Sequence, residues 1–173
     1  KTVSVLDENG MLPLFTAPMD TVIELEHRKI FTDSQIYPII PRTQTKFFNA
    51  SDCKGVNDWV ALSLDQFEKL FLAENSEMNS EVVQVCIDIA NGHMQRLMDV
   101  VKKTRKKFDN QLILMVGNVA NPHTFIELSK AGADYVRVGI GNGSGCSTSV
   151  HTGIGYPLAS LIHDIQNEKE KHP

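Results

Sequence analysis

One stretch of the sequence combines a nucleophilic side chain with a backbone suited to ligand binding. Residues 139–156 read GIGNGSGCSTSVHTGIGY, so Cys146 follows a run of glycine and serine. Glycine permits positive φ and close approach of a ligand to the main chain, and successive N–H groups in such a loop bind anions such as phosphate. This composition predicts a loop rather than regular helix or strand across the stretch.

Cys146 is the candidate reactive group of this loop. A thiol whose pKa is lowered by N–H dipoles or a nearby cation attacks carbon well, which predicts a covalent nucleophile. Spacing alone leaves an alternative equally open, namely a glycine-rich surface loop that carries an incidental cysteine.

The elements that would position this loop follow a repeated order. Continuous apolar runs alternate with amphipathic helical patterns, which is typical of a parallel α/β sheet buried on both faces. The runs predict six strands, at 12–16, 36–40, 59–63, 82–87, 112–116 and 135–138. Helices are expected at 24–31, from Asp65, around 94–101, between Asn121 and Gly132, and around 158–165.

Polar residues follow the predicted strands, at the edge where α/β proteins bind ligands. They are Asp20, Arg42, Asp88, Asn118 and Cys146. We expect these residues to converge only if the sheet curls into a barrel. Arg137, on the sixth predicted strand, is expected to face the interior, and His93 is expected to cap or pack.

The composition excludes several classes of protein. The formal net charge is −4 with dispersed lysine and arginine, so no nucleic-acid partner is expected, and no apolar run is long enough to predict a membrane span. Nothing at the start resembles a signal peptide. Cys53, Cys86 and Cys146 are odd in number and widely spaced, which argues against disulfides or a zinc cluster. We expect a cytoplasmic protein with Cys86 in the core.

Five motifs, in order and in spacing, resemble the family of IMP dehydrogenases and GMP reductases, which are (β/α)8 barrels. They are APMDTV at 17–22, DIANGH at 88–93, GNV at 117–119, AGADYVRVGIGNGSGCSTS at 131–149 and TGIGYP at 152–157. The resemblance covers nearly the whole chain, and the cysteine-loop motif is the most specific part of it. It implies an α/β TIM barrel of which about six βα units are present, with residues 1–173 forming a single partial catalytic domain.

The resemblance implies a purine nucleotide oxidoreductase that uses NADP(H) or NAD(H) and a monovalent cation, K⁺. Tyr156 favours the reductase branch, in which GMP is deaminated to IMP with NADPH through a Cys146 thioimidate. The alternatives are an IMP dehydrogenase, which converts IMP to XMP with NAD, and a non-catalytic nucleotide-binding protein. The expected partner is a purine mononucleotide, GMP or IMP, with no membrane partner, in a homotetramer.

The resemblance also implies roles for individual residues. Cys146 and Thr148 are the expected catalytic residues, and Ala17, Met19, Arg137, Ser144 and Gly145 the expected nucleotide-binding residues. Asp88, Asn118 and Gly139 are expected to bind the cofactor, and the carbonyl groups of Gly141, Gly143 and Cys146 the cation.

The sequence departs from the family pattern in three ways. Ser149 stands where the family usually has arginine, and Arg42 ends the second predicted strand where reductases carry histidine or lysine. A full barrel takes about 250 residues, whereas this chain has 173 and ends in the polar segment NEKEKHP. We therefore expect the chain to be part of a longer protein and to show no turnover alone.

Overall fold

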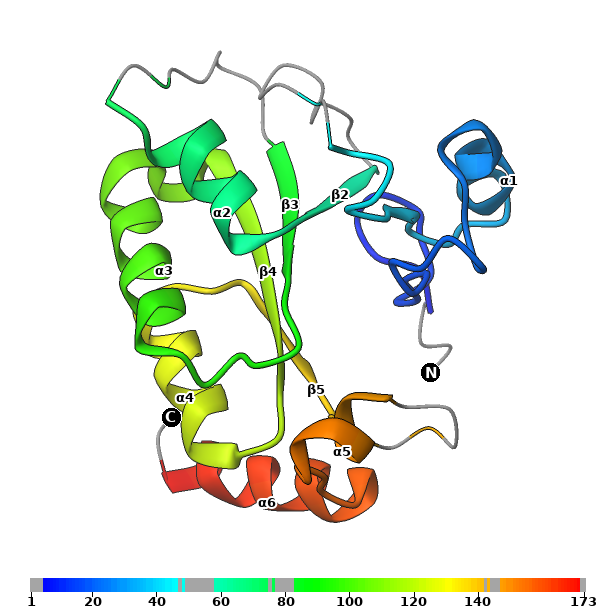
Figure 1. Ribbon diagram of the computed structural model, residues 1–173. Helices are drawn as coiled ribbons and strands as arrows, with labels where there is room; N and C mark the ends of the chain where they lie inside the picture. Colours follow the sequence, from blue (N-terminus) through cyan, green and yellow to red (C-terminus); the bar gives the residue numbers. More distant parts are fainter. Residues whose placement is uncertain are drawn as a thin grey trace. The chain divides into compact units, whose positions relative to one another are not determined.

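The computed structural model describes residues 5–46, 48, 58–74, 76, 83–141, 143 and 147–171 (Figure 1). In chain order, the elements are η1 (Leu25–His27), α1 (Arg28–Asp33), β1 (Ile39–Ile40), β2 (Trp59–Leu62), α2 (Leu64–Phe67), η3 (Glu68–Leu72), β3 (Val83–Asp88), α3 (Gln95–Phe108), η4 (Asp109–Gln111), β4 (Leu112–Val119), α4 (Pro122–Ala131), β5 (Tyr135–Val138), α5 (Ser147–Thr152) and α6 (Leu158–Lys171). They fall into two compact units, which we describe separately. The first unit takes in residues 1–87 and 110–113, and the second 88–109 and 114–173.

The strands pair in parallel within each unit. In the first unit β1 pairs with β2, and β2 with β3; in the second unit β4 pairs with β5. Continuous apolar sequence explains this arrangement, since all four residues of β2 are buried. The parallel α/β class is confirmed, and closure into a barrel stays a prediction.

The first predicted strand is the exception. Residues 12–16 contribute one parallel bridge, from Phe15 to Tyr37, rather than a strand. Pro13 is the second residue of this run and has no N–H to donate to a ladder. Phe15 of this run packs against two aromatic rings instead. Its ring centroid lies 4.9 Å from that of Tyr37 in a stacked arrangement and 5.7 Å from that of Trp59 in a T-shaped one.

The helices of the first unit differ in detail from the prediction. The helix expected at 24–31 is the 3₁₀ turn η1 followed by α1, which extends to Asp33. The helix expected from Asp65 begins at Leu64, because Ser63 and Gln66 form a capping box at its start. Phe67 and Phe71 are fully buried, with ring centroids 5.0 Å apart.

The second unit contains α3, α4, α5 and α6, together with the segments that follow β3, β4 and β5. α4 packs against α3, β5 and α6, and α6 also contacts β5; Figure 1 shows α3 and α4 side by side. The buried residues follow helical spacing, with Leu97, Val100 and Val101 on α3 and Leu161 and Ile165 on α6.

The ends of α4 were predictable. The Asn121 side chain accepts hydrogen bonds from the backbone N–H groups of His123 at 2.8 Å and Thr124 at 3.4 Å, Pro122 opens the helix, and Gly132 ends it at φ +109°. α6 runs to Lys171, so residues 167–171 of the polar segment are helical. None of the helices in the described part of the chain is long and apolar enough to cross a membrane.

The prediction of a loop throughout 139–156 is wrong for residues 147–152, which form α5. The physical reason is the placement of the glycines. Those of the stretch lie before Ser147 or after Thr152, so the intervening STSVHT has no helix breaker. Gly153, at φ +66°, donates its N–H to the carbonyl of Ser149 at 2.9 Å and ends the helix.

Candidate active site at the carboxyl ends of the strands

In the second unit, backbone hydrogen bonds join the chain at the ends of β3 and β4. The Ile89 N–H donates to the Gly117 carbonyl at 2.9 Å, and the Asn118 N–H donates to the Ile89 carbonyl at 2.7 Å. The Gly92 N–H donates to the Asn118 carbonyl at 2.8 Å. These bonds fix the loop after β3 against the last residues of β4.

Asp88, the last residue of β3, forms an ion pair with Arg137 of β5. Nη1 of Arg137 lies 2.6 Å from Oδ1 of Asp88, and the side chains are 25% and 23% exposed. At this partial burial the attraction is less screened than on an open surface, and the charge-assisted bond fixes both side chains. Two residues that were predicted to bind different ligands thus contact each other directly.

Gly117 makes the position of Arg137 possible. It lies opposite Arg137 in the β4–β5 register and has φ +144°. A Cβ at this position would lie 2.5 Å from the Arg137 carbonyl oxygen and 2.8 Å from the Arg137 Cβ. Only glycine therefore fits here without displacing the neighbouring strand.

Gly92 has a similar role in the loop after β3. A Cβ on Gly92 would lie 2.6 Å from Cγ1 of Val119 and 2.7 Å from the Asn118 carbonyl oxygen. Neither Gly92 nor Gly117 was predicted to have a role in the site, although they belong to the motifs DIANGH and GNV.

Asn118 connects β4 to the start of the cysteine loop. Its side-chain Nδ2 donates to the Gly139 carbonyl at 2.9 Å, and the Gly139 N–H donates to the Val119 carbonyl at 2.8 Å. The structure therefore brings together four predicted site residues, Asp88, Asn118, Arg137 and Gly139, at the ends of β3, β4 and β5.

His93 holds the segment between β4 and α4. Its Nε2 accepts the Ala120 N–H at 3.1 Å, so the neutral ring carries its proton on Nδ1, which lies 2.8 Å from Oγ1 of Thr124. Burial lowers the pKa of His93, because the charged ring is less well solvated there. Of the two expected roles, capping and packing, these hydrogen bonds fit the first, since the residue is exposed.

The central residues of the cysteine loop, Ser144, Gly145 and Cys146, lie outside the described residues, and the Thr148 side chain is likewise not described. Gly141 and Gly143, which were predicted to bind the cation, are described. Gly141 has φ +78°, and a Cβ there would lie 2.6 Å from the Ser149 Cβ and 3.1 Å from the Ile154 carbonyl oxygen. The start and the end of the loop are therefore in contact at Gly141, whereas Gly143 is exposed.

The predicted nucleotide-binding residues Ala17 and Met19 lie in the first unit. Both are exposed, Met19 at 55%. Next to them, one carboxylate oxygen of Asp20 accepts hydrogen bonds from Oγ1 of Thr43 at 2.6 Å and Nε2 of Gln44 at 2.9 Å. These bonds lower the pKa of Asp20 and hold this loop to the segment that follows β1.

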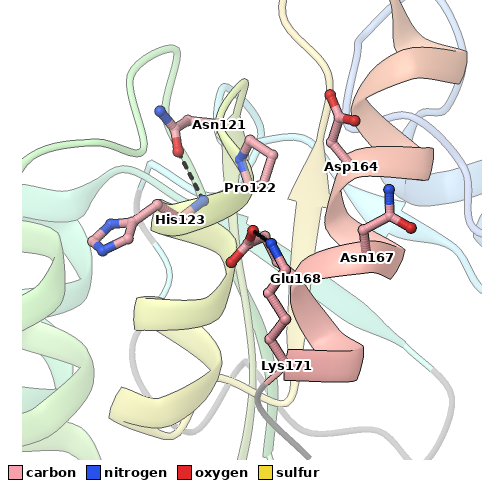
Figure 2. A pocket seen from close by; sticks show the side chains of 7 residues that line it. All are labelled: Asn121, Pro122, His123, Asp164, Asn167, Glu168 and Lys171. Atoms are coloured by element: carbon pink, nitrogen blue, oxygen red, sulfur yellow. Dashed lines mark hydrogen bonds and ion pairs between the residues drawn. The ribbon is translucent and has the colours of Figure 1, made fainter.

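A separate cavity of about 430 Å³ lies between the start of α4 and α6 (Figure 2). It is lined by Asn121, Pro122, His123, Asp164, Asn167, Glu168 and Lys171. The residues predicted to form the site are not among these. The Asn121 side chain caps α4, and Lys171 pairs with Glu168 at 2.7 Å, so these three side chains already have hydrogen-bond partners.

Among the described residues, one group of side chains could approach a single metal ion. It consists of Glu24, Glu26 and His27, all of which are exposed. Since exposed acidic groups commonly gather without binding a metal, this cluster is not part of the candidate site.

The parallel sheet, together with Asp88, Asn118 and Arg137 at its strand ends, defines an α/β protein whose candidate ligand site lies at the carboxyl ends of parallel strands. Residues 9–173 match the family described as IMP dehydrogenase / GMP reductase domain. The chain therefore belongs to this family, as the motifs predicted.

Curated relatives carry the name GMP reductase. The chain is 35% identical to the protein of Vibrio atlanticus over 156 residues, 34% identical to that of Vibrio cholerae over 158, and 33% identical to that of Buchnera aphidicola over 162. In each case the match covers 87% of this chain and 45% of the relative. The chain thus spans slightly less than half the length of these relatives.

Proposed function

We propose that this chain is part of a GMP reductase, which converts GMP to IMP with NADPH. The observation that carries the proposal is the placement of two contacts at the strand ends that precede the cysteine loop, the Asp88–Arg137 ion pair and the hydrogen bond from Asn118 to Gly139. The reductase is preferred over an IMP dehydrogenase because the relatives described above are named GMP reductase.

The reaction begins with addition of the Cys146 thiolate to C2 of the guanine ring. The bond between C2 and the exocyclic amino nitrogen then breaks once that nitrogen is protonated. Ammonia leaves, and C2 remains bound to the cysteine sulfur as a thioimidate. NADPH, when bound, supplies a hydride to C2. Breakage of the C–S bond then releases IMP and restores the thiolate. Thr148, two residues after Cys146, is proposed to assist the departure of ammonia.

Asp88, Asn118 and Arg137 are proposed to bind and orient the cofactor and the purine. A carboxylate is a suitable acceptor for the ribose hydroxyl groups of a dinucleotide, and the Asn118 amide adds a donor and an acceptor nearby. The partial exposure of Asp88 and Arg137 supports access by a ligand. The Arg137 charge keeps Asp88 oriented and favours negative charge that develops on the purine.

The remaining proposed roles concern the phosphate and the cation. Ser144 and Gly145 are proposed to bind the nucleotide phosphate, and the exposed residues Ala17 and Met19 to contact the nucleotide. K⁺ is proposed to bind the carbonyl groups of Gly141, Gly143 and Cys146. The φ of Gly141, +78°, supports a specialised backbone conformation at the first of these positions.

The test follows the near-ultraviolet absorbance of reduced nicotinamide in the presence of potassium. It uses the chain alone and the chain joined to the carboxyl-terminal part of the Vibrio cholerae relative. Loss of absorbance with GMP and NADPH is expected for the joined protein. A gain with IMP and NAD would instead identify a dehydrogenase, and nucleotide binding without either change would identify a non-catalytic nucleotide-binding protein.

Cys146→Ala in the joined protein is expected to lower kcat by several orders of magnitude and to keep nucleotide binding, because it removes only the nucleophile. Cys86→Ala is the matched control, since Cys86 is a buried thiol in β3. Its expected effect is on stability rather than on turnover per folded molecule. Normal turnover by Cys146→Ala would refute the proposed nucleophile.

A further inference from the structure

A tyrosine–aspartate hydrogen bond joins the end of the cysteine loop to α6. The Tyr156 hydroxyl group donates to Oδ2 of Asp164. Tyr156 is partly buried and precedes Pro157, directly before α6, whereas Asp164 projects from the middle of that helix and also lines the cavity in Figure 2.

The rest of the loop is held at its beginning. Gly139 is bonded to Val119 and Asn118, and Gly141 contacts Ser149 and the backbone at Ile154. The Tyr156–Asp164 bond thus anchors the side of the loop that the bonds at Gly139 do not reach. Between these anchors lies α5, whose first residue, Ser147, directly follows Cys146 in the sequence.

α6 has other contacts that keep it in place. Leu161 is fully buried and Ile165 is 7% exposed, and the helix packs against α4 and β5. The hydrogen bond of Asp164 is therefore not needed to dock the helix, and its effect falls on the segment that contains Tyr156.

We propose that Tyr156 is a positioning residue, whose hydrogen bond to Asp164 fixes residues 153–157 on α6 and thereby restrains α5, the helix that directly follows Cys146 in the sequence. This inference rests on the proposed role of Cys146 as the reacting thiol. The Tyr156 hydroxyl group is protonated and able to donate at neutral pH, as is usual for a phenol, and the bond to Asp164 raises the pKa of this phenol further.

The experiment compares Tyr156→Phe with Asp164→Asn. Phenylalanine keeps the ring and removes the donor, whereas asparagine keeps an acceptor oxygen and removes the charge. Tyr37→Phe is the matched control, since Tyr37 donates to Oδ2 of Asp7 at 2.5 Å in the first unit.

Hydrogen exchange measures the tether directly. Tyr156→Phe is expected to speed amide exchange in peptides covering residues 147–157 by about five- to tenfold, the factor that corresponds to one net hydrogen bond. Exchange in α3 and α4 is expected to stay the same. Asp164→Asn is expected to give a smaller increase, and Tyr37→Phe none in this segment.

Thiol chemistry measures positioning, which a merely structural contact would not affect. The rate of alkylation of Cys146 by iodoacetamide is followed against pH, with peptide mass mapping to separate Cys146 from Cys53 and Cys86. Tyr156→Phe is expected to shift this pH profile, Asp164→Asn to shift it less, and Tyr37→Phe to leave it unchanged.

Several outcomes would overturn the proposal. They are unchanged exchange at 147–157, an equal rise in α3 and α4 that indicates general destabilisation, and local acceleration with an unaltered alkylation profile. The turnover assay stays separate, since silence with GMP and NADPH would refute the proposed reaction while the exchange result still tests the tether.

Discussion

Arg137 and Asp88 illustrate how one contact constrains two residues of a candidate site. The pair is about three-quarters buried, so loss of either partner would leave the other charge partly desolvated and without its closest opposite charge. For this reason single substitutions at Asp88 or Arg137 will affect both proposed ligands. Roles assigned to these residues from separate motif positions have to be tested as a pair.

At the residue scale, the neutral state of His93 predicts a pH dependence of stability. Because burial lowers its pKa in the folded state, the unfolded chain binds this proton more readily. The contribution of His93 to the free energy of unfolding is therefore complete above the ordinary histidine pKa of about 6.5 and decreases as the pH falls toward its lower folded-state pKa.

His93→Gln is expected to lower the free energy of unfolding by about 1 kcal/mol at neutral pH, because the Ala120 N–H loses its imidazole acceptor. It is also expected to weaken the decline in stability on acidification. Urea unfolding at about pH 7.5 and about pH 5.5 measures both effects. His123→Gln is the control, since the His123 side chain is 78% exposed. An unchanged pH dependence in His93→Gln would contradict the prediction.

At the element scale, the turns that join the strand ends depend on glycine. Gly117→Ala is expected to reduce the free energy of unfolding by about 2 kcal/mol or more, because φ is +144° and the new methyl group would overlap Arg137. Gly143→Ala is the matched control, with an expected change within about 0.5 kcal/mol, since no atom of the described residues lies within 4 Å of a Cβ there.

Urea unfolding of both glycine variants measures this difference. Equal effects at the two positions would show that the backbone at Gly117 relaxes without cost, contrary to the geometry described.

The elements were predictable where local sequence decides them. Asn121, Pro122 and Gly132 specify the ends of α4 through capping, which depends on neighbouring residues alone. The strand predicted at 12–16 and the loop predicted throughout 139–156 were wrong, because Pro13 has no N–H to donate to a ladder and the segment STSVHT contains no helix breaker. Contacts between distant residues, such as Asp88 with Arg137 and Tyr156 with Asp164, depend on strand register and helix rotation, which periodicity does not determine.

For the candidate site, the sequence predicted residues but not their contacts. Family motifs predicted Asp88, Asn118, Arg137 and Gly139 as site residues; the structure places these four at neighbouring strand ends, and their binding roles stay predictions. The supporting roles of Gly92 and Gly117 were missed, because a glycine in a motif does not reveal which neighbouring atom approaches it.

At the scale of the whole molecule, the chain presents apolar side chains on one flank of α6. Leu158 is 40% and Ile162 53% exposed, whereas Leu161 and Ile165, on the adjacent face of the same helix, are buried. Exposed apolar side chains that lie next to each other promote association between molecules. We therefore expect this flank to cause aggregation of the chain when it is produced alone, since it spans 45% of the length of the Vibrio atlanticus relative.

The double variant Leu158→Gln/Ile162→Gln is expected to change the free energy of unfolding by no more than about 1 kcal/mol, because neither side chain is in the core. It is expected to reduce concentration-dependent association in light scattering. Leu161→Gln/Ile165→Gln, the matched control, is expected to lower the free energy of unfolding by about 3 kcal/mol or more. A large loss in the first variant would show that the exposed flank contributes to the core.

The backbone bonds among Ile89, Gly92, Gly117 and Asn118 have a consequence for evolution. Because each loop supplies a partner to the other, neither can change its path without breaking a bond that the other requires. We therefore expect new ligand preferences to arise through exchanged side chains or through the cysteine loop. A change in the backbone path of one of the two joined turns is expected to require a matching change in the other.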